Sequence, residues 1–96
     1  MKSISTPKGI LKYRNPTVLE NMTLLKDARS YFSKDDPIGA KISIMEKLSP
    51  LLDYSELDGI SSFEDLNNFG EEMTVPLSEI ADDILSKLVV AFTKKP

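Results

Sequence analysis

The C-terminal part of the chain contains the sequence LSEIADDILSKLVVAF at residues 77–92. Its apolar residues recur at spacings of three and four, the pattern of one face of an α-helix. These residues are Leu77, Ile80, Ala81, Ile84, Leu85, Leu88 and Phe92. Acidic residues come early and Lys94 and Lys95 come last, which suits the helix macrodipole. The segment therefore predicts a helix over 77–93 with one face in a core.

The last turns of this helix are apolar beyond a single stripe, because Val89, Val90 and Ala91 follow one another. Such residues are either buried on several sides within the domain or form an interface with a subunit or partner. A chain of 96 residues has little left to cover them near its C-terminus. We predict that the partner-binding residues are Leu85, Val89, Val90 and Phe92.

A second helical pattern begins after the step Asn15-Pro16. Thr17 followed by Glu20 is a capping box, so a helix is expected over 17–32. Its predicted apolar stripe consists of Val18, Met22, Leu25, Ala28 and Phe32, widened by Leu24 and Tyr31.

A third helix is expected over 37–52, with Asp36 as its N-cap and Pro37 at its first position. The residues that it should offer to the core are Ile38, Ile42, Met45, Leu48 and Leu52, with Ile44 and Leu51 at the edge. Pro50 cannot donate a backbone hydrogen bond, which predicts a kink or a fresh start there. A short extra helix is then expected over 51–57.

The N-terminal residues favour β-structure. The turn signal at 7–9 separates two short strand-like runs, 3–6 and 10–14, which predicts a hairpin. A loose arm with one strand is the alternative. We expect one domain over 1–96, with a hairpin or arm at 1–14 and a helical core at 17–93.

Between the helices expected over 37–52 and 77–93, Ser61 and Ser62 start two overlapping capping boxes. They predict a short helix that ends at Gly70. Residues 71–76 are expected to form a loop, since a residue before proline is biased away from helix. The predicted fold class is therefore mainly α: a small single-domain helical bundle with a short N-terminal β-hairpin or strand.

The amino-acid composition excludes several classes of function. Hydrophobic residues make up 41% and charged residues 28%, as in a globular protein. No cysteine or histidine occurs, which removes disulfides, thiol nucleophiles and the commonest general base and metal ligand. We predict that the protein is not an enzyme and that it has no catalytic, cofactor-binding or metal-binding residues. No apolar run is long enough for a membrane span, and the N-terminus lacks a signal-peptide core, so a cytoplasmic location is expected.

The net charge of −3 hides two halves of opposite sign. Residues 1–34 contain seven basic and two acidic residues, whereas residues 35–96 contain five basic and thirteen acidic ones. The acidic stretch 53–83 is either a solvated surface or a docking surface for a basic partner. The cations near the N-terminus are scattered among apolar positions, so nucleic-acid binding is not predicted.

Two segments carry a family resemblance. Residues 11–20, LKYRNPTVLE, lead from a strand through a proline step into a helix, and residues 77–85 with Phe92 form an amphipathic closing helix. In this order of elements the chain resembles the tail assembly chaperones of tailed bacteriophages. The resemblance implies a non-enzymatic protein of the host bacterial cytoplasm that binds the tape-measure protein and assists assembly of tail tube protein around it. It implies no catalytic residues and no membrane.

Two other functions fit the same sequence. The chain could be a small acidic regulator or inhibitor that binds a host protein, with residues 53–83 as a mimic of DNA charge. It could also be a plain subunit of a larger bacterial assembly. In each case we expect a homo-oligomer or a protein partner, because a domain of this size has a modest margin of stability.

Overall fold

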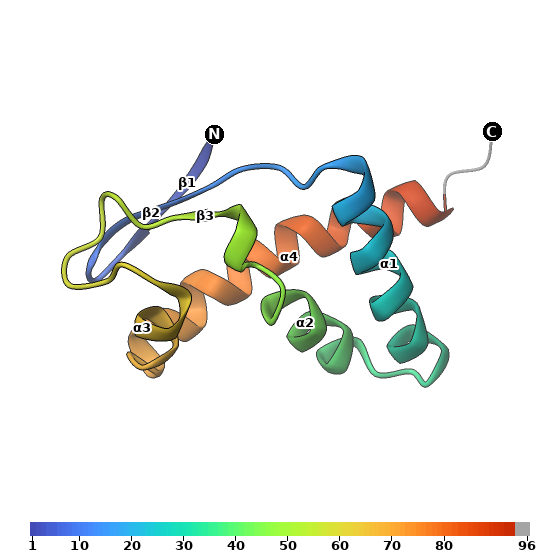
Figure 1. Ribbon diagram of the computed structural model, residues 1–96. Coiled ribbons are helices and arrows are strands. Elements are labelled where there is room, and N and C mark those ends of the chain that lie inside the picture. Colours follow the sequence, from blue (N-terminus) through green and yellow to red (C-terminus); the bar gives the residue numbers. More distant parts are fainter. Residues whose placement is uncertain (94–96) are drawn as a thin grey trace.

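The computed structural model describes residues 1–93, except the side chains of residues 89 and 91–93 (Figure 1). Its elements are β1 (Lys2–Thr6), β2 (Gly9–Tyr13), α1 (Val18–Ser33), α2 (Pro37–Met45), the 3-10 turn η1 (Ser49–Leu51), β3 (Leu52–Asp53), α3 (Phe63–Asn67) and α4 (Glu71–Thr93). Helices dominate, but they pack with a three-stranded antiparallel sheet. The fold is therefore mixed α and β, and the prediction of a mainly α bundle with a single hairpin was too narrow.

The predicted hairpin is confirmed. β1 and β2 pair antiparallel with Ile4 opposite Leu11, and Thr6 opposite Gly9 closes the ladder at the turn. The hydroxyl of Thr6 donates to the carbonyl oxygen of Gly9 at 2.8 Å. Leu11 and Tyr13 point into the core, whereas Ile10 is exposed, as the alternation of a strand requires.

The expected helix over 51–57 is wrong. Leu52 pairs with Tyr13 and Asp53 with Lys12, so this segment becomes the third strand of the sheet. Leu57 forms a further antiparallel bridge with Gly9. The helix 37–52 correspondingly ends early, at Met45, and Pro50 lies in η1. The free edge of β2 supplies hydrogen-bond partners that outweigh the local helix propensity of this stretch.

The predicted helix starts are confirmed by their side chains. The Thr17 hydroxyl accepts from the amide of Glu20, and the Glu20 carboxylate accepts from the amide of Thr17, which completes a capping box. Asp36 accepts from the amide of Gly39 at 2.9 Å, with Pro37 at the first position of α2. These contacts satisfy amides that a helix leaves without internal partners.

The buried faces of α1 and α2 differ from the predicted ones. The buried residues of α1 are Leu24 and Ala28. Those of α2 are Ala40, Ser43 and Ile44. Four residues expected to face the core are instead exposed: Val18, Met22, Ile38 and Ile42. Phe32 is also exposed. Apolar residues occupy so many positions of both helices that periodicity alone did not determine which face is covered.

The expected loop over 71–76 is also wrong, because α4 begins at Glu71 and contains Pro76. Gly70 turns the chain with a φ of 56° and its carbonyl accepts from the amides of Met73 and Thr74. Pro76 lies in the second turn of α4, where it removes one helix hydrogen bond, but both Met73 and Pro76 are buried. Their burial favours helix over the local bias of the residue before proline.

One hydrophobic cluster draws on the sheet and on all four helices described within residues 1–93. Its fully buried large side chains are Leu11, Ile44, Leu48, Leu66, Met73 and Ile80. In Figure 1, α4 spans the molecule, with the sheet and α3 at one end and α1 at the other. α2 packs against both α1 and α4. The apolar face of α4 is thus the surface that most of the other elements share.

The turn of the hairpin approaches the loop after β3 closely. Gly9 has a φ of +126°, and a side chain there would lie 2.3 Å from the carbonyl oxygen of Glu56. Around it, the amide of Ile10 donates to that same carbonyl oxygen at 3.2 Å, and the amide of Asp58 donates to Lys8 at 2.8 Å. Only glycine fits this position without moving the loop.

We therefore expect Gly9→Ala to lower the free energy of unfolding by at least about 2 kcal/mol, through backbone strain and loss of the loop contact. The matched control is Gly59→Ala, which also has a positive φ but meets no atom within 4 Å. This control substitution should lower the free energy of unfolding by only about 1 kcal/mol. Urea denaturation of both variants measures the difference, and equal losses would contradict the close contact.

Candidate functional site

The first turns of α1 expose three large apolar side chains. Val18 is 77% exposed, Leu19 78% and Met22 58%. Val18 and Leu19 lie between the two residues of the capping box and Met22 lies just after it, so the hydrogen bonds of Thr17 and Glu20 hold this first turn in place. Large apolar side chains grouped at one place on a surface are typical of a site that binds another molecule.

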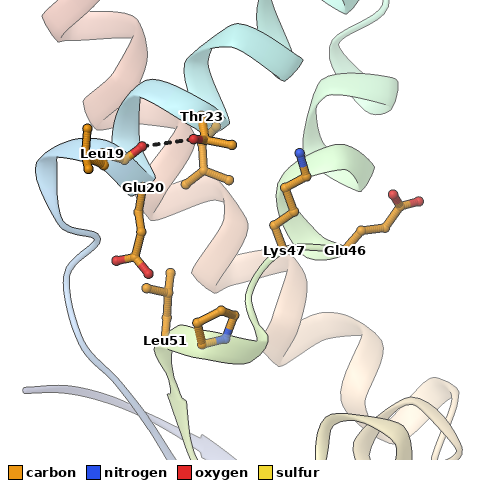
Figure 2. Close-up of a pocket in the computed structure, with 8 residues that line it drawn as sticks. Leu19, Glu20, Thr23, Glu46, Lys47 and Leu51 are labelled. Carbon is orange, nitrogen blue, oxygen red and sulfur yellow. Dashed lines mark hydrogen bonds between the residues drawn. The ribbon is translucent and has the colours of Figure 1, made fainter.

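A groove runs beside these residues, between the start of α1 and the end of α2 with η1 (Figure 2). This α1–α2 groove has a volume of about 460 Å3. It is lined by Leu19, Glu20, Thr23, Leu24, Glu46, Lys47, Pro50 and Leu51. Leu24 and Leu51 are almost fully buried, which makes the inner wall apolar. Leu19 lines the groove while most of its side chain stays open to solvent.

A second groove of about 280 Å3 lies on the other side of α1, against α4. This α1–α4 groove is lined by Asn15, Pro16, Asn21, Met22, Leu25, Ile84, Lys87 and Leu88. Leu19 thus borders one groove and Met22 the other. The start of α1 is a ridge with an apolar depression on each side.

Two of the charged residues that line the α1–α2 groove, Glu20 and Lys47, are already paired. Arg14 binds the Glu20 carboxylate with two hydrogen bonds of 2.7 and 2.9 Å, and the amide of Thr17 donates to the same carboxylate at 2.8 Å. The Arg14 guanidinium and these amide contacts lower the pKa of Glu20 to about 2. Lys47 forms an ion pair with Asp27. A ligand in the groove would therefore meet apolar surface, these paired groups and the exposed carboxylate of Glu46.

The opposite charges of the two halves of the chain meet within the fold. Three lysines of the hairpin form ion pairs with carboxylates that follow in the acidic stretch. These pairs are Lys2 with Asp83 at 2.8 Å, Lys8 with Glu72 at 3.7 Å and Lys12 with Glu56 at 2.5 Å. The basic N-terminus thus binds part of the acidic segment in cis.

Asp83 is the most connected of these carboxylates. It accepts a hydrogen bond from Lys2 and another from the hydroxyl of Tyr13, at 3.2 Å, and it lies 3.5 Å from Lys87. The hydrogen bond from Lys2 holds the pKa of Asp83 below its usual value, and burial raises the pKa of Tyr13. These contacts fasten the sheet to α4.

The predicted partner-binding residues lie on the second half of α4. Leu85 is half-buried and packs against the core, and Val90 is 61% exposed. The side chains of Val89 and Phe92 lie outside the described residues. Val18 and Met22 were predicted to lie in the core and Leu19 had no predicted role, so the ridge was not predicted. No signal in the sequence separated these residues from core residues, because their exposure follows from the packing of α1 on α2.

No group of three or more acidic residues in the part of the chain that the structure describes could hold a metal ion. Within the same part, every helix is too short or too polar to cross a membrane. Comparisons with protein families, curated proteins and solved structures gave no match to this chain.

The Glu20 contacts predict a pH dependence. Because the folded-state pKa lies below the ordinary value of 4.5, this group stabilises the fold above about pH 4.5, and its contribution is lost as pH falls toward 2. Glu20→Gln should therefore destabilise the protein at pH 7, and the gap to wild type should narrow below pH 4.

Thermal unfolding at pH 7 and pH 3 measures this effect. The matched control is Glu46→Gln, because Glu46 lines the same groove but forms no ion pair within the described residues. The control should track wild type at both values. A constant gap between Glu20→Gln and wild type would contradict the ionised Arg14–Glu20 contact.

Proposed function

We propose that the chain is a non-enzymatic protein that holds a partner polypeptide by apolar contact. The supporting observation is the ridge at the start of α1, where Val18, Leu19 and Met22 are exposed between two apolar grooves. Together with the resemblance of residues 11–20 and 77–85, this supports a tail assembly chaperone whose partner is the tape-measure protein, with tail tube protein as a further partner.

The relative magnitudes of the interactions favour apolar contact over charge. Fully burying a leucine or methionine side chain contributes roughly 1.5–3 kcal/mol, whereas a surface ion pair contributes roughly 0–1 kcal/mol. Three such side chains stand open on one ridge, and the charges of Arg14, Glu20 and Lys47 beside the α1–α2 groove are already paired. Affinity should therefore come mainly from the ridge.

The shape of the site suits a helical partner. A groove beside a helix accepts the apolar stripe of an amphipathic helix, whose side chains recur at about every 3–4 residues. A tape-measure protein is a long, largely helical chain that exposes such stripes. Such a chain needs a holder that covers the stripes while presenting a charged exterior, and the acidic surface of this protein supplies that exterior.

The alternative function, an acidic regulator that mimics DNA, requires carboxylates that are free to meet a basic partner. Glu56, Glu72 and Asp83 are instead paired with lysines of the hairpin. Asp53 and Asp65 accept hydrogen bonds from amides of neighbouring serines. The three ion pairs offset part of the charge that residues 53–83 could offer, and so they favour the holding function. The amide hydrogen bonds instead lower the pKa of Asp53 and Asp65 and keep both side chains ionised.

We expect Leu19→Glu to reduce the amount of tape-measure protein that co-expression keeps soluble by about tenfold, because it places a charge on the ridge. The free energy of unfolding should change by less than about 0.5 kcal/mol, since Leu19 is 78% exposed. The measurement is the soluble fraction after co-expression with the tape-measure protein of the same phage.

The matched control is Ile38→Glu, which introduces the same charge at a residue of α2 that is 70% exposed and lines neither groove. It should behave like wild type. If Leu19→Glu and Ile38→Glu lowered the soluble fraction equally, the ridge would not be the contact surface. A complex that dissociates between low and physiological salt and is competed by DNA would instead support the acidic regulator.

A further inference from the structure

A third groove lies between α2, α3 and α4. This α2–α3 groove has a volume of about 370 Å3. It is lined by Ile42, Met45, Glu46, Phe63, Asn67 and Leu77. Most of these residues are apolar. Leu77 is almost fully buried, whereas Ile42 stays 49% exposed. Like the α1–α2 groove, this groove therefore offers apolar surface that the core leaves uncovered.

Glu46 is the residue that the α1–α2 and α2–α3 grooves have in common. It directly follows the last residue of α2, and it is exposed. Among the residues that the structure describes, its carboxylate makes neither an ion pair nor a hydrogen bond. Figure 2 shows it extending away from Lys47, whose ammonium group pairs with Asp27 instead. An unpaired carboxylate thus stands between two apolar depressions.

The backbone of α2 makes the same place favourable for a cation. The C-terminus of a helix carries the negative end of the macrodipole, so a lysine or arginine there is stabilising and a carboxylate is not. The last turn of α2 contains no basic residue, and its C-cap is Glu46 itself. Two features, the unpaired carboxylate and the helix end, therefore favour a positive group at this point.

We propose that the two grooves and Glu46 together bind a helical segment of the partner that carries a lysine or arginine between apolar residues of one stripe. This inference rests on the proposed holding function and specifies the chemistry of the segment that is held. A segment whose apolar side chains fill both grooves must pass over Glu46 and remove it from water. Removing an unpaired carboxylate from water is strongly unfavourable, so a cation is required there to pair with it.

The apolar and the charged contacts have different roles in this interface. The side chains in the grooves supply most of the affinity, because burying apolar surface contributes more than a surface ion pair. The carboxylate of Glu46 selects among apolar stripes and orients the bound segment. Glu20 and Lys47 are already paired within the chain. Glu46 is thus the residue of the α1–α2 groove that determines specificity by charge.

Synthetic peptides test the proposal on the full chain. Three helical peptides of about 20 residues share one leucine stripe and differ only at its central position, which is lysine, glutamine or glutamate. Fluorescence anisotropy should show that the lysine peptide binds wild type about tenfold more tightly than the glutamate peptide, with glutamine between them. Glu46→Lys should reverse this order. The melting temperature of this variant should not fall, because a lysine suits the end of α2.

The matched control is Glu79→Lys, which makes the same charge change at an exposed residue of α4 that lines none of the three grooves. It should keep the wild-type order of the peptides. The proposal is overturned if no peptide binds, if all three bind wild type equally, or if Glu46→Lys leaves the order unchanged. It is also overturned if sedimentation velocity shows that wild type self-associates and Glu46→Lys does not, because a second copy would then be the occupant.

Co-expression separates this proposal from the proposed function. Glu46→Lys should lower the soluble fraction of the tape-measure protein by at least about threefold, since it sets like charges against one another. If the wild type fails to keep the tape-measure protein soluble while the peptides retain their order, only the proposed function is contradicted. If wild type and Glu46→Lys keep it equally soluble, only the role of Glu46 is contradicted.

Discussion

The apolar face of α4, from Met73 to Leu88, is the surface against which the sheet, α2 and α3 pack. Ile80 and Ala81, near the middle of this face, are completely buried. The sheet is too small to be stable in isolation, and α3 has only five residues. These elements persist because α4 covers their apolar sides. The Lys2 and Tyr13 contacts to Asp83 then align the sheet on that helix.

The charge distribution along the chain has its explanation in this packing. The hairpin comes from the basic part of the sequence and α4 from the acidic part, and folding brings Lys2 to Asp83 and Lys8 to Glu72. Each such surface pair contributes little by itself. Together they lower the repulsion among the carboxylates of the second half. The sequence between Lys47 and Lys87 contains no cation that could do so. The uneven distribution of charge therefore contributes first to the stability of the fold and only then to the binding of a partner.

The helix α1 is covered differently from the rest. It packs on α2, which itself packs on α4, so the start of α1 lies at the outside of the molecule. Leu24 and Ala28 suffice to anchor it, and the capping box with Arg14 holds its first turn. Its other apolar residues are therefore left for contacts beyond the chain. The proposed function depends on this excess of apolar surface over what the core can cover.

Local chemistry in the sequence determined the hairpin, the starts of α1, α2 and α3, and the helical character of residues 77–93, because turn residues and caps such as Thr17, Asp36 and Ser62 act on their nearest neighbours. It did not determine β3, the start of α4 at Glu71, or the faces of α1 and α2. Leu52 forms a strand only because β2 offers an edge, and Pro76 stays in a helix only because its surroundings bury it. Which of Val18, Leu19, Leu24 and Ile44 is covered depends on neighbours distant in the sequence, so the tertiary structure alone decided where the apolar ridge lies.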